Sequence, residues 1–440
     1  MINETVSCRV TGITHDLRGV ARVGQRVWFV DGALPDEQVS AQPVKTAGSG
    51  QQSVDAALVA VESDVSALRC EPSCEHYAVC GGCSVQHITY EGQVQLKQQA
   101  LLQQIKRLGG VMPAQVLPPL LSSAWEYRRR ARLSIRRDGA QGVVLGFRQR
   151  SSHAVVAVPH CRVLRPALRA LLAPLQDCLS GWSSLKQLGH VDVLEVGTPV
   201  QVSVRVTGTP RDADLIRLRD FADNTGVTVW VETGDGEETQ NVLVSGATVC
   251  DNTLPVDFFQ GNADVNEAMV LAVQTALAVQ PEDRVLDAFC GVGNFTLPLA
   301  CQAASVTACD VVAGMVQRAA IRAKHHGIGN AVFRTVNLES PTEAARLHGV
   351  NKILLDPPRT GARQFCLSIP LSSVSRLVYV SCNPATLARD TAVLVQRGWL
   401  LSSVQLVDMF PQTAHMECIA VFHPALRQRK KKMTSRSRWS

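Results

Sequence analysis

The stretch RVLDAFCGVGNFTLPLA, residues 284–300, decides the fold of the C-terminal part of this chain. An apolar run that ends at Phe289 predicts a buried strand, and Gly291 and Gly293 then lead into residues that favour a helix from about Asn294. A strand, a glycine loop and a helix in this order are typical of the first crossover in an open α/β sheet. Glycines at that turn let the backbone approach a ligand closely, so we expect a nucleotide-like cofactor there.

The same alternation of strand-like and helical stretches continues to the end of the chain. We therefore predict a Rossmann-like, doubly wound and largely parallel α/β domain over residues 256–424. The strands that we expect in it are RVLDAF, SVTACD, AVFRTV, KILLD, LVYVSC and IAVFH.

Two carboxylates end later strands of this predicted sheet. Asp310 follows the glycine loop at a distance where a carboxylate can accept hydrogen bonds from ribose hydroxyls, and Asp356 ends another strand in LLDPPRTG. Thr296 stands where the dinucleotide fingerprint has its third glycine, which favours S-adenosylmethionine over NAD. Two plainer interpretations are that Asp310 only caps the following helix and that Asp356 belongs to a rigid turn.

A cysteine follows the apolar run in LVYVSCNPATLARD, residues 377–390. Cys382 would lie at the carboxyl ends of the parallel strands, where we expect the cofactor to bind, and we call this end of the sheet the cofactor edge. Backbone amides there can lower the pKa of a thiol and make it a nucleophile. Glu417 precedes the last strand and could bring a general base to the same edge. Methylation of a pyrimidine at C5 needs both groups, because a thiolate must add at C6 and a base must later remove the C5 proton. Taken singly, each residue is more often an ordinary packed or solvated one, but their joint placement favours the enzyme.

Two further regions precede this domain. Residues 1–65 hold short alternating strands with glycine turns, which predict a small OB-like β-barrel that could bind RNA. Residues 66–255 hold a cysteine-rich loop, a helical pattern over 92–108 and strand-like segments with a hairpin turn at Asp138-Gly139. We expect a central, mainly β domain here, with the helix available to pack on the C-terminal domain.

The cysteine-rich loop, RCEPSCEHYAVCGGCSVQH, predicts a metal site of one of two kinds. The chain has 14 cysteines and no secretory signal, so these residues are expected to be reduced thiols or ligands rather than disulfides. A local zinc site would use Cys70, Cys74, Cys80 and Cys83. A [4Fe-4S] cluster would instead use Cys74, Cys80, Cys83 and the distant Cys161.

Four motifs together resemble the RNA uracil-C5 methyltransferases, and within them the 23S ribosomal RNA branch with a TRAM barrel and an iron-sulfur cluster. SCNPATLARD, HMEC, LDAFCGVGNFTLPLA and FFQGN match that family along nearly the whole chain. The resemblance implies that Cys382 is the nucleophile and Glu417 the base. It also favours the [4Fe-4S] set with Cys161, leaving Cys70 without a role. The residues that it implies for S-adenosylmethionine are Gln260, Phe289, Asn294, Asp310, Asn337 and Asp356.

The implied reaction is methyl transfer to C5 of one uridine in 23S ribosomal RNA, through a covalent Cys382 adduct. Because the target base must leave its stack to meet the thiol, we expect it to be flipped out. Two alternatives stay open from the residues: cytosine-C5 methylation of RNA, and a non-catalytic protein of ribosomal RNA binding or assembly.

Charge and hydropathy bound the partners. The last sixteen residues hold seven Lys or Arg and no acid, and subtracting seven from the net charge of +6 leaves −1 for residues 1–424. Residues 425–440 are therefore a basic tail, expected to be disordered and to attract phosphate non-specifically. No secretory signal or run long enough to span a membrane occurs, so we expect a cytoplasmic monomer without a stable protein partner.

A row of arginines in EYRRRARLSIRR is the other basic feature. Alternate positions would share one face of a strand, which suits phosphate contact, although a solvated strand face is an equal interpretation. The residues of this row are Arg128, Arg130, Arg132 and Arg136.

Overall fold

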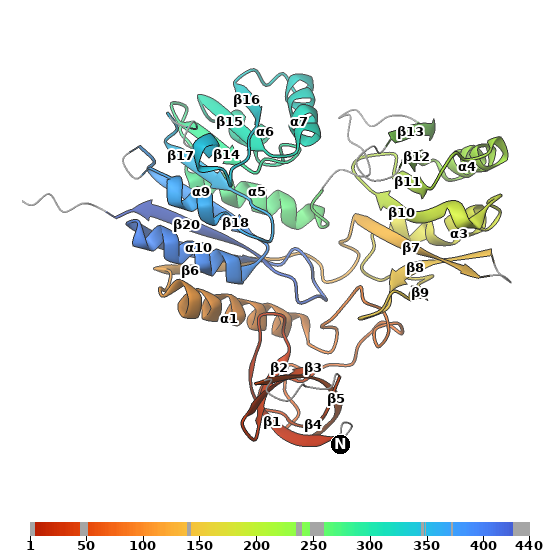
Figure 1. The fold of residues 1–440 in the computed structure, drawn as a ribbon, viewed down its shortest axis with the longest axis horizontal. Helices are drawn as coiled ribbons and strands as arrows, with labels where there is room; N and C mark the ends of the chain where they lie inside the picture. The colour runs from red at the N-terminus through yellow and green to blue at the C-terminus, as the bar shows by residue number, and fades with distance from the viewer. Residues whose placement is uncertain are drawn as a thin grey trace, which may run out of the picture.

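Three sheets organise the chain (Figure 1). The computed structural model describes residues 5–44, 52–138, 142–234, 240–246, 259–344, 347, 349–370 and 373–425. The basic tail that we expect from residue 425 lies outside this part, apart from Ala425 itself. No helix within the described ranges has both the length and the apolar character needed to cross a bilayer.

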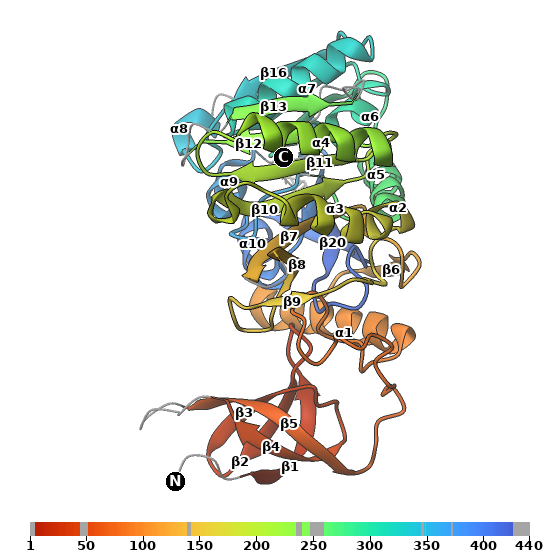
Figure 2. The same cartoon turned by 90° about the vertical axis from the view of Figure 1, so that its right-hand side faces the viewer.

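The N-terminal sheet is a closed barrel with strand order β1-β2-β3-β5-β4. Its strands are β1 (Val6–Ile13), β2 (Gly19–Val23), β3 (Arg26–Asp31), β4 (Gln38–Pro43) and β5 (Ser53–Ser63). Alternate side chains such as Val10, Val30 and Val39 fill its interior. The predicted small barrel is thus confirmed, and Figure 2 shows it at one end of the molecule.

The central sheet has seven strands in the order β13-β12-β11-β10-β7-β8-β9. They are β7 (Arg130–Asp138), β8 (Gly142–Arg148), β9 (Val155–Ala157), β10 (Leu188–Leu194), β11 (Gln201–Val206), β12 (Thr228–Thr233) and β13 (Gln240–Ser245). The helices of this region are α2 (Pro166–Ala170), α3 (Leu172–Ser180) and α4 (Asp212–Thr225). The expected hairpin is β7 with β8, in which Asp138 pairs with Gly142, while Gly139 lies outside the described residues.

The C-terminal sheet has eight strands in the order β16-β15-β14-β17-β18-β20-β19-β6. Its strands are β6 (Gln115–Leu120), β14 (Arg284–Ala288), β15 (Ser305–Asp310), β16 (Ala331–Thr335), β17 (Lys352–Leu355), β18 (Arg376–Ser381), β19 (Trp399–Val407) and β20 (Glu417–Pro424). The strands from β14 to β18 run parallel, and β20 is antiparallel to both of its neighbours. Six of the expected strand runs therefore form one sheet, with a reversal at β20.

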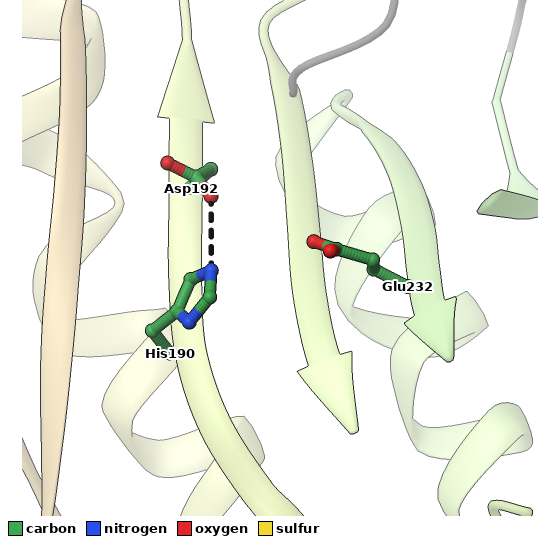
Figure 3. A group of neighbouring side chains, drawn as sticks. All are labelled: His190, Asp192 and Glu232. Carbon is green, nitrogen blue, oxygen red and sulfur yellow. Dashed lines mark ion pairs between the residues drawn. The ribbon is translucent and has the colours of Figure 1, made fainter. Parts of the chain in front are cut away.

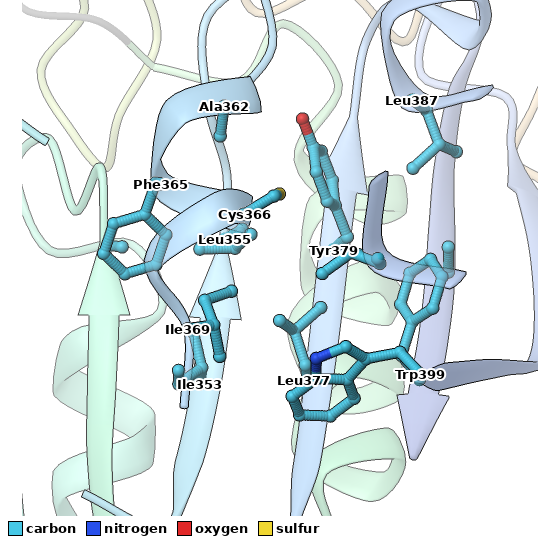
Figure 4. Packing of buried hydrophobic residues seen from close by; sticks show 14 of the residues in the cluster. Ile353, Leu355, Ala362, Phe365, Cys366, Ile369, Leu377, Tyr379, Leu387 and Trp399 are labelled. Carbon is cyan, nitrogen blue, oxygen red and sulfur yellow. The ribbon is translucent and has the colours of Figure 1, made fainter. Parts of the chain in front are cut away.

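Helices bury both faces of this sheet, as a doubly wound fold requires. They are α5 (Ala263–Leu277), α6 (Thr296–Ala300), α7 (Ala313–His325), α8 (Pro341–Ala344), α9 (Arg363–Ser368) and α10 (Pro384–Gln396). Successive strand residues point to opposite sides: Leu377 and Tyr379 join the core under α9 and α10, whereas Val378 joins the core under α5. Figure 4 shows the first of these cores, with Tyr379 and Trp399 packed among aliphatic side chains.

Two elements from residues 66–255 lie with the C-terminal sheet: the helix that we expected to be available for such packing, and a strand that we had assigned to the central domain. Helix α1 (Tyr90–Gly109) buries Leu101 and Ile105 in the same core as α10, and β6 is the edge strand beside β19. Gly110 ends the helix in a left-handed conformation with φ of 67°, close to the end of the helical pattern that we predicted over residues 92–108. The central region is therefore interrupted, because the chain crosses to the C-terminal sheet before it returns to form β7.

Candidate active site

The two predicted catalytic residues meet at one edge of the C-terminal sheet. Ser381 at the end of β18 pairs with Cys418 at the start of β20. One step further along this antiparallel register places Cys382 opposite Glu417. Asp356, which follows the neighbouring strand β17, lies at the same edge. The structure thus brings together a thiol and two carboxylates that are far apart in the sequence.

Glu417 has the environment of a general base. Its side chain is only 5% exposed, and its Oε2 atom has no hydrogen-bond partner among the residues that the structure describes. Burial raises the pKa of Glu417 to about 7. A carboxyl group that titrates near neutral pH can both take up and release a proton under physiological conditions.

Cys382 differs from the expectation in one respect. Its pKa is raised, first by burial and then by the charges of Glu417 and Asp356, while Arg359 acts in the opposite direction. The predicted lowering of this pKa is therefore wrong as a net effect. The backbone N–H of Cys382 does lower the pKa, as predicted, but burial and the two carboxylates outweigh it.

The glycine loop after β14 has the conformation that close approach of a ligand requires. Gly291 and Gly293 have φ of 54° and 87°. Asp310 braces this loop, since its Oδ2 accepts the N–H of Gly291 at 3.0 Å and its Oδ1 accepts the N–H of Val312 at 2.9 Å. The interpretation of Asp310 as the cap of the following helix is wrong, because α7 has Val312 as its N-cap residue and no side-chain cap bond.

Sequence reasoning missed Asp287, a carboxylate inside β14. It is fully buried, and its Oδ2 accepts a hydrogen bond of 2.5 Å from the Thr296 hydroxyl at the start of α6. Burial raises the pKa of Asp287 to about 7. The residue that replaces the third glycine of a dinucleotide fingerprint therefore connects β14 to α6. A charged residue in the middle of an apolar run was the signal that could have found it.

The other predicted cofactor residues occupy different settings. Gln260 is 7% exposed, and its Oε1 has no partner in the described part of the chain. The side chain of Asn294 exchanges hydrogen bonds of 3.0 and 3.1 Å with Asn266 of α5, a partner that sequence reasoning did not find. Asn337 is exposed after β16, and its Oδ1 accepts the N–H of Glu339. Phe289 follows β14 directly, with φ of 68°.

The cofactor edge is strongly acidic. Burial raises the pKa of Asp356 well above its ordinary value, and the charges of Glu417, Asp287 and Asp310 add to the effect. Carboxylates gathered in this way favour a cation. Together with the unpartnered oxygen of Gln260, this edge fits a cationic sulfonium such as S-adenosylmethionine.

Comparison with known proteins also indicates a methyltransferase. The family described as tRNA (Uracil-5-)-methyltransferase matches residues 238–424. A protein of Pseudomonas entomophila described as 23S rRNA (uracil(1939)-C(5))-methyltransferase RlmD is 41% identical over 423 residues, which cover 93% of this chain and 92% of that protein. The chain belongs to the RNA uracil-C5 methyltransferase family. A protein of the same description from Vibrio cholerae is 40% identical over 421 residues, with 93% and 94% covered.

A solved structure shares the fold of this family member. The tRNA (uracil-54, C5)-methyltransferase of Pyrococcus abyssi in complex with S-adenosyl-L-homocysteine superposes with a TM-score of 0.68. The match covers 95% of this chain and 100% of that chain at 20% identity, so it supports the arrangement of the elements alone.

Four cysteines of this methyltransferase line one pocket. Cys74, Cys80, Cys83 and Cys161 line it together with Tyr77 and Phe147. Cys70 is not part of this lining, and its thiol donates to the carbonyl oxygen of Gln86 at 3.4 Å. Among the described residues, no three of the four cysteine sulfurs lie within 4.8 Å of one another. Thiolates around a single zinc ion are roughly 4 Å apart, so these sulfurs do not have the spacing of a zinc site in this structure.

One other group of side chains has the spacing of metal ligands: His190 and Asp192 of β10 with Glu232 of β12 (Figure 3). Arg132 binds Asp192 through both of its oxygens, and Arg205 pairs with Glu232 at 2.6 Å. The two arginines supply the charge that a metal ion would supply, and we assign no metal here. Because Arg132 is engaged in this way, its guanidinium is less available for the phosphate contact that we predicted for the row of arginines.

Proposed function

We propose that the chain transfers a methyl group from S-adenosylmethionine to C5 of a uridine in 23S ribosomal RNA. The observation that carries this proposal is the placement of Cys382 opposite Glu417 at the edge that holds the glycine loop. The named substrate of the Pseudomonas and Vibrio relatives supports the choice of RNA.

The chemistry follows from what each side chain can do. The sulfur of Cys382 forms a bond to C6 of the uracil, which makes C5 a nucleophile. S-adenosylmethionine supplies the electrophilic methyl group that C5 takes up. Glu417 then removes the proton from C5, the bond between sulfur and C6 breaks, and the thiolate is regenerated. Glu417 has to be ionised for this last step, which its pKa of about 7 permits near neutral pH.

We assign the cofactor to the acidic edge. Phe289 and Asn294 flank the glycine loop, and Gln260 precedes α5. Asp310, Asn337 and Asp356 lie at or just after the ends of later strands. A bound sulfonium would offset the carboxylate charges that raise the pKa of Cys382, so cofactor binding would favour the thiolate.

We assign a [4Fe-4S] cluster to the pocket of Cys74, Cys80, Cys83 and Cys161. The proposed reaction needs no electron, so the cluster would tie the cysteine loop to the central region, from which Cys161 comes. Loss of methylation on one-electron reduction of a folded, cluster-loaded protein would contradict this structural role.

We further propose that the target uridine is flipped out to reach Cys382 and that the OB-like barrel acts as a TRAM-type platform for flanking RNA. Binding requires no second copy of the chain in this scheme, and we expect a cytoplasmic monomer.

Product analysis tests the proposal. Anaerobically purified protein is incubated with methyl-labelled S-adenosylmethionine and unmodified 23S ribosomal RNA, and the RNA is digested to nucleosides. We expect the label in 5-methyluridine. Label in 5-methylcytidine would assign the cytosine reaction, and binding of RNA without label would favour a non-catalytic protein.

A further inference from the structure

The segment of residues 408–416 joins β19 to β20 and leads directly into Glu417. It contains no helix or strand, yet most of its side chains are buried. Irregular segments are ordinarily exposed because their backbone polar groups need partners. The bonds that satisfy this segment therefore decide where Glu417 lies.

Gln412 is the most constrained residue of the segment. Its φ is 66°, a left-handed conformation that costs a non-glycine residue on the order of 1 kcal/mol, and its side chain is only 4% exposed. Gln93 of α1 holds it from two sides. The N–H of Gln412 donates to Gln93 Oε1 at 2.9 Å, and Gln93 Nε2 donates to Gln412 Oε1 at 3.0 Å.

Ser84 holds the same segment from the cysteine loop. Its N–H donates to the carbonyl oxygen of Gln412 at 3.0 Å, and the N–H of Val85 donates to that oxygen at 3.2 Å. The hydroxyl of Ser84 accepts the N–H of Ala414 at 2.9 Å. Ser84 directly follows Cys83, one of the four pocket cysteines, so the cysteine loop contacts the chain three residues before Glu417.

Two further contacts anchor the start of the segment. Lys97 of α1 donates to Asp408 Oδ1 at 2.6 Å, and both side chains are fully buried. The hydroxyl of Tyr127 donates to the carbonyl oxygen of Pro411 at 2.9 Å. These anchors fix residues 408–411, whereas Gln93 and Ser84 fix the part nearest to Glu417.

We propose that Gln93, Ser84 and Gln412 form a positioning knot that sets Glu417 for proton removal. The inference rests on the proposed function, since it concerns one step of that reaction. Glu417 influences bond formation between Cys382 and C6 only through its charge, which raises the pKa of Cys382, whereas removal of the C5 proton needs the Glu417 carboxylate in place. A loosened knot should therefore slow release of the methylated product and leave RNA covalently bound.

The test compares Gln93→Ala with Gln99→Ala, a variant at an exposed glutamine of the same helix. Each cluster-loaded protein is mixed with S-adenosylmethionine and RNA of natural uridine, and denaturation-resistant protein–RNA complex is quantified during turnover. We expect Gln93→Ala to accumulate this methylated adduct about tenfold over wild type, with kcat and the KM for RNA lowered together because the slowed step follows adduct formation. Gln99→Ala should behave like wild type.

A merely structural role of Gln93 predicts a different result, in which adduct formation and product release fall together and no adduct accumulates. That result would overturn the proposal. Should Gln93→Ala fail to fold, Ser84→Ala decides the question, because it removes only the acceptor of the Ala414 N–H. Faster hydrogen exchange at the Ala414 amide must then accompany adduct accumulation, and exchange without accumulation would contradict the inference.

The proposed function fails independently of this inference. If wild-type protein forms no 5-methyluridine, the assigned reaction is wrong. If wild type is active and neither knot variant accumulates adduct, only the positioning role is wrong.

Discussion

Cys382 and Glu417 face each other because β20, which lies between β18 and β19 in the sheet, is antiparallel to both strands. The pairing of Ser381 with Cys418 brings the end of one strand to the start of another. In an all-parallel sheet these two residues would lie at opposite ends of the strands. The reversal at β20 thus brings Glu417, the proposed base, to the strand ends where Cys382, the proposed nucleophile, and the glycine loop lie.

Replacing Glu417 by glutamine should separate the two halves of the reaction. The amide cannot accept the C5 proton, so we expect turnover to fall by a factor on the order of 100 to 10,000 while the covalent methylated complex accumulates. The measurement is a denaturing gel of protein–RNA complex beside a count of 5-methyluridine. Equal loss of both signals would show that Glu417 acts before the methyl transfer.

The pH dependence follows from the raised pKa of Glu417. The base is active only when ionised, so the single-turnover rate of product release should rise with pH through about 7 and level off above it. A rate that is flat between pH 6 and about 8 would exclude Glu417 as the group that limits release.

The same shift has a consequence for stability. Because burial raises the pKa of Glu417 above its unfolded value, the folded protein favours the protonated form, and stability is lost as the pH rises through about 7. Glu417→Gln removes this titration. We therefore expect the variant to have a higher free energy of unfolding than wild type at pH 8, and the difference should shrink toward pH 5. Urea unfolding at both pH values measures it.

Thr296 should matter for the glycine loop through Asp287. Thr296→Val leaves Asp287 Oδ2 buried without its hydroxyl donor, which costs about 1–3 kcal/mol. The matched control is Thr275→Val on the exposed side of α5, where the hydroxyl bonds only to the carbonyl oxygen of Leu271. We expect a lower free energy of unfolding for the first variant and little change for the second. Equal effects would mean that the contact with Asp287 is unimportant.

The cysteine pocket predicts opposite outcomes for two thiols. Cys161→Ser should lose bound iron, whereas Cys70→Ser should retain it, because Cys70 does not line the pocket. Iron and acid-labile sulfide per chain provide the measurement. If Cys161→Ser retained its metal and Cys70→Ser lost it, the alternative of a local zinc site that includes Cys70 would be favoured.

Removal of the metal should also loosen the segment of residues 408–416 that precedes Glu417. Since Ser84 follows Cys83 and its hydroxyl accepts the N–H of Ala414, stripping the cluster with a chelator should speed hydrogen exchange at the Ala414 amide. Amides of the barrel, such as that of Val30, serve as the internal control. Unchanged exchange at Ala414 would show that the cysteine loop holds this segment without its metal.

Residue patterns within short stretches predicted single strands, a helix end and a hairpin. The strand of residues 284–288, the stop at Gly110 and the hairpin that pairs Asp138 with Gly142 all follow from neighbouring residues. The edge that gathers Cys382, Asp356 and the glycine loop was also predictable, because the carboxyl ends of parallel strands lie together.

Contacts between distant segments were not predictable in the same way. Nothing in the spacing of Gln93 or Gln412 indicates that they bond to each other across more than 300 residues. The addition of β6 to the C-terminal sheet depends on pairing with the distant β19, which no local residue pattern indicates. The raised pKa of Cys382 arises from burial and from carboxylates on other strands, so the local turn gave the wrong sign.

The most direct test of the account is a covalent trap with RNA that carries 5-fluorouridine. Fluorine at C5 cannot leave as a proton, so wild-type protein with S-adenosylmethionine should stall as a denaturation-resistant adduct, and Cys382→Ala should form none. The mass of the cross-linked peptide should place the bond at Cys382. Absence of an adduct from protein that binds the RNA and retains its cluster would contradict the assignment of Cys382 as the nucleophile.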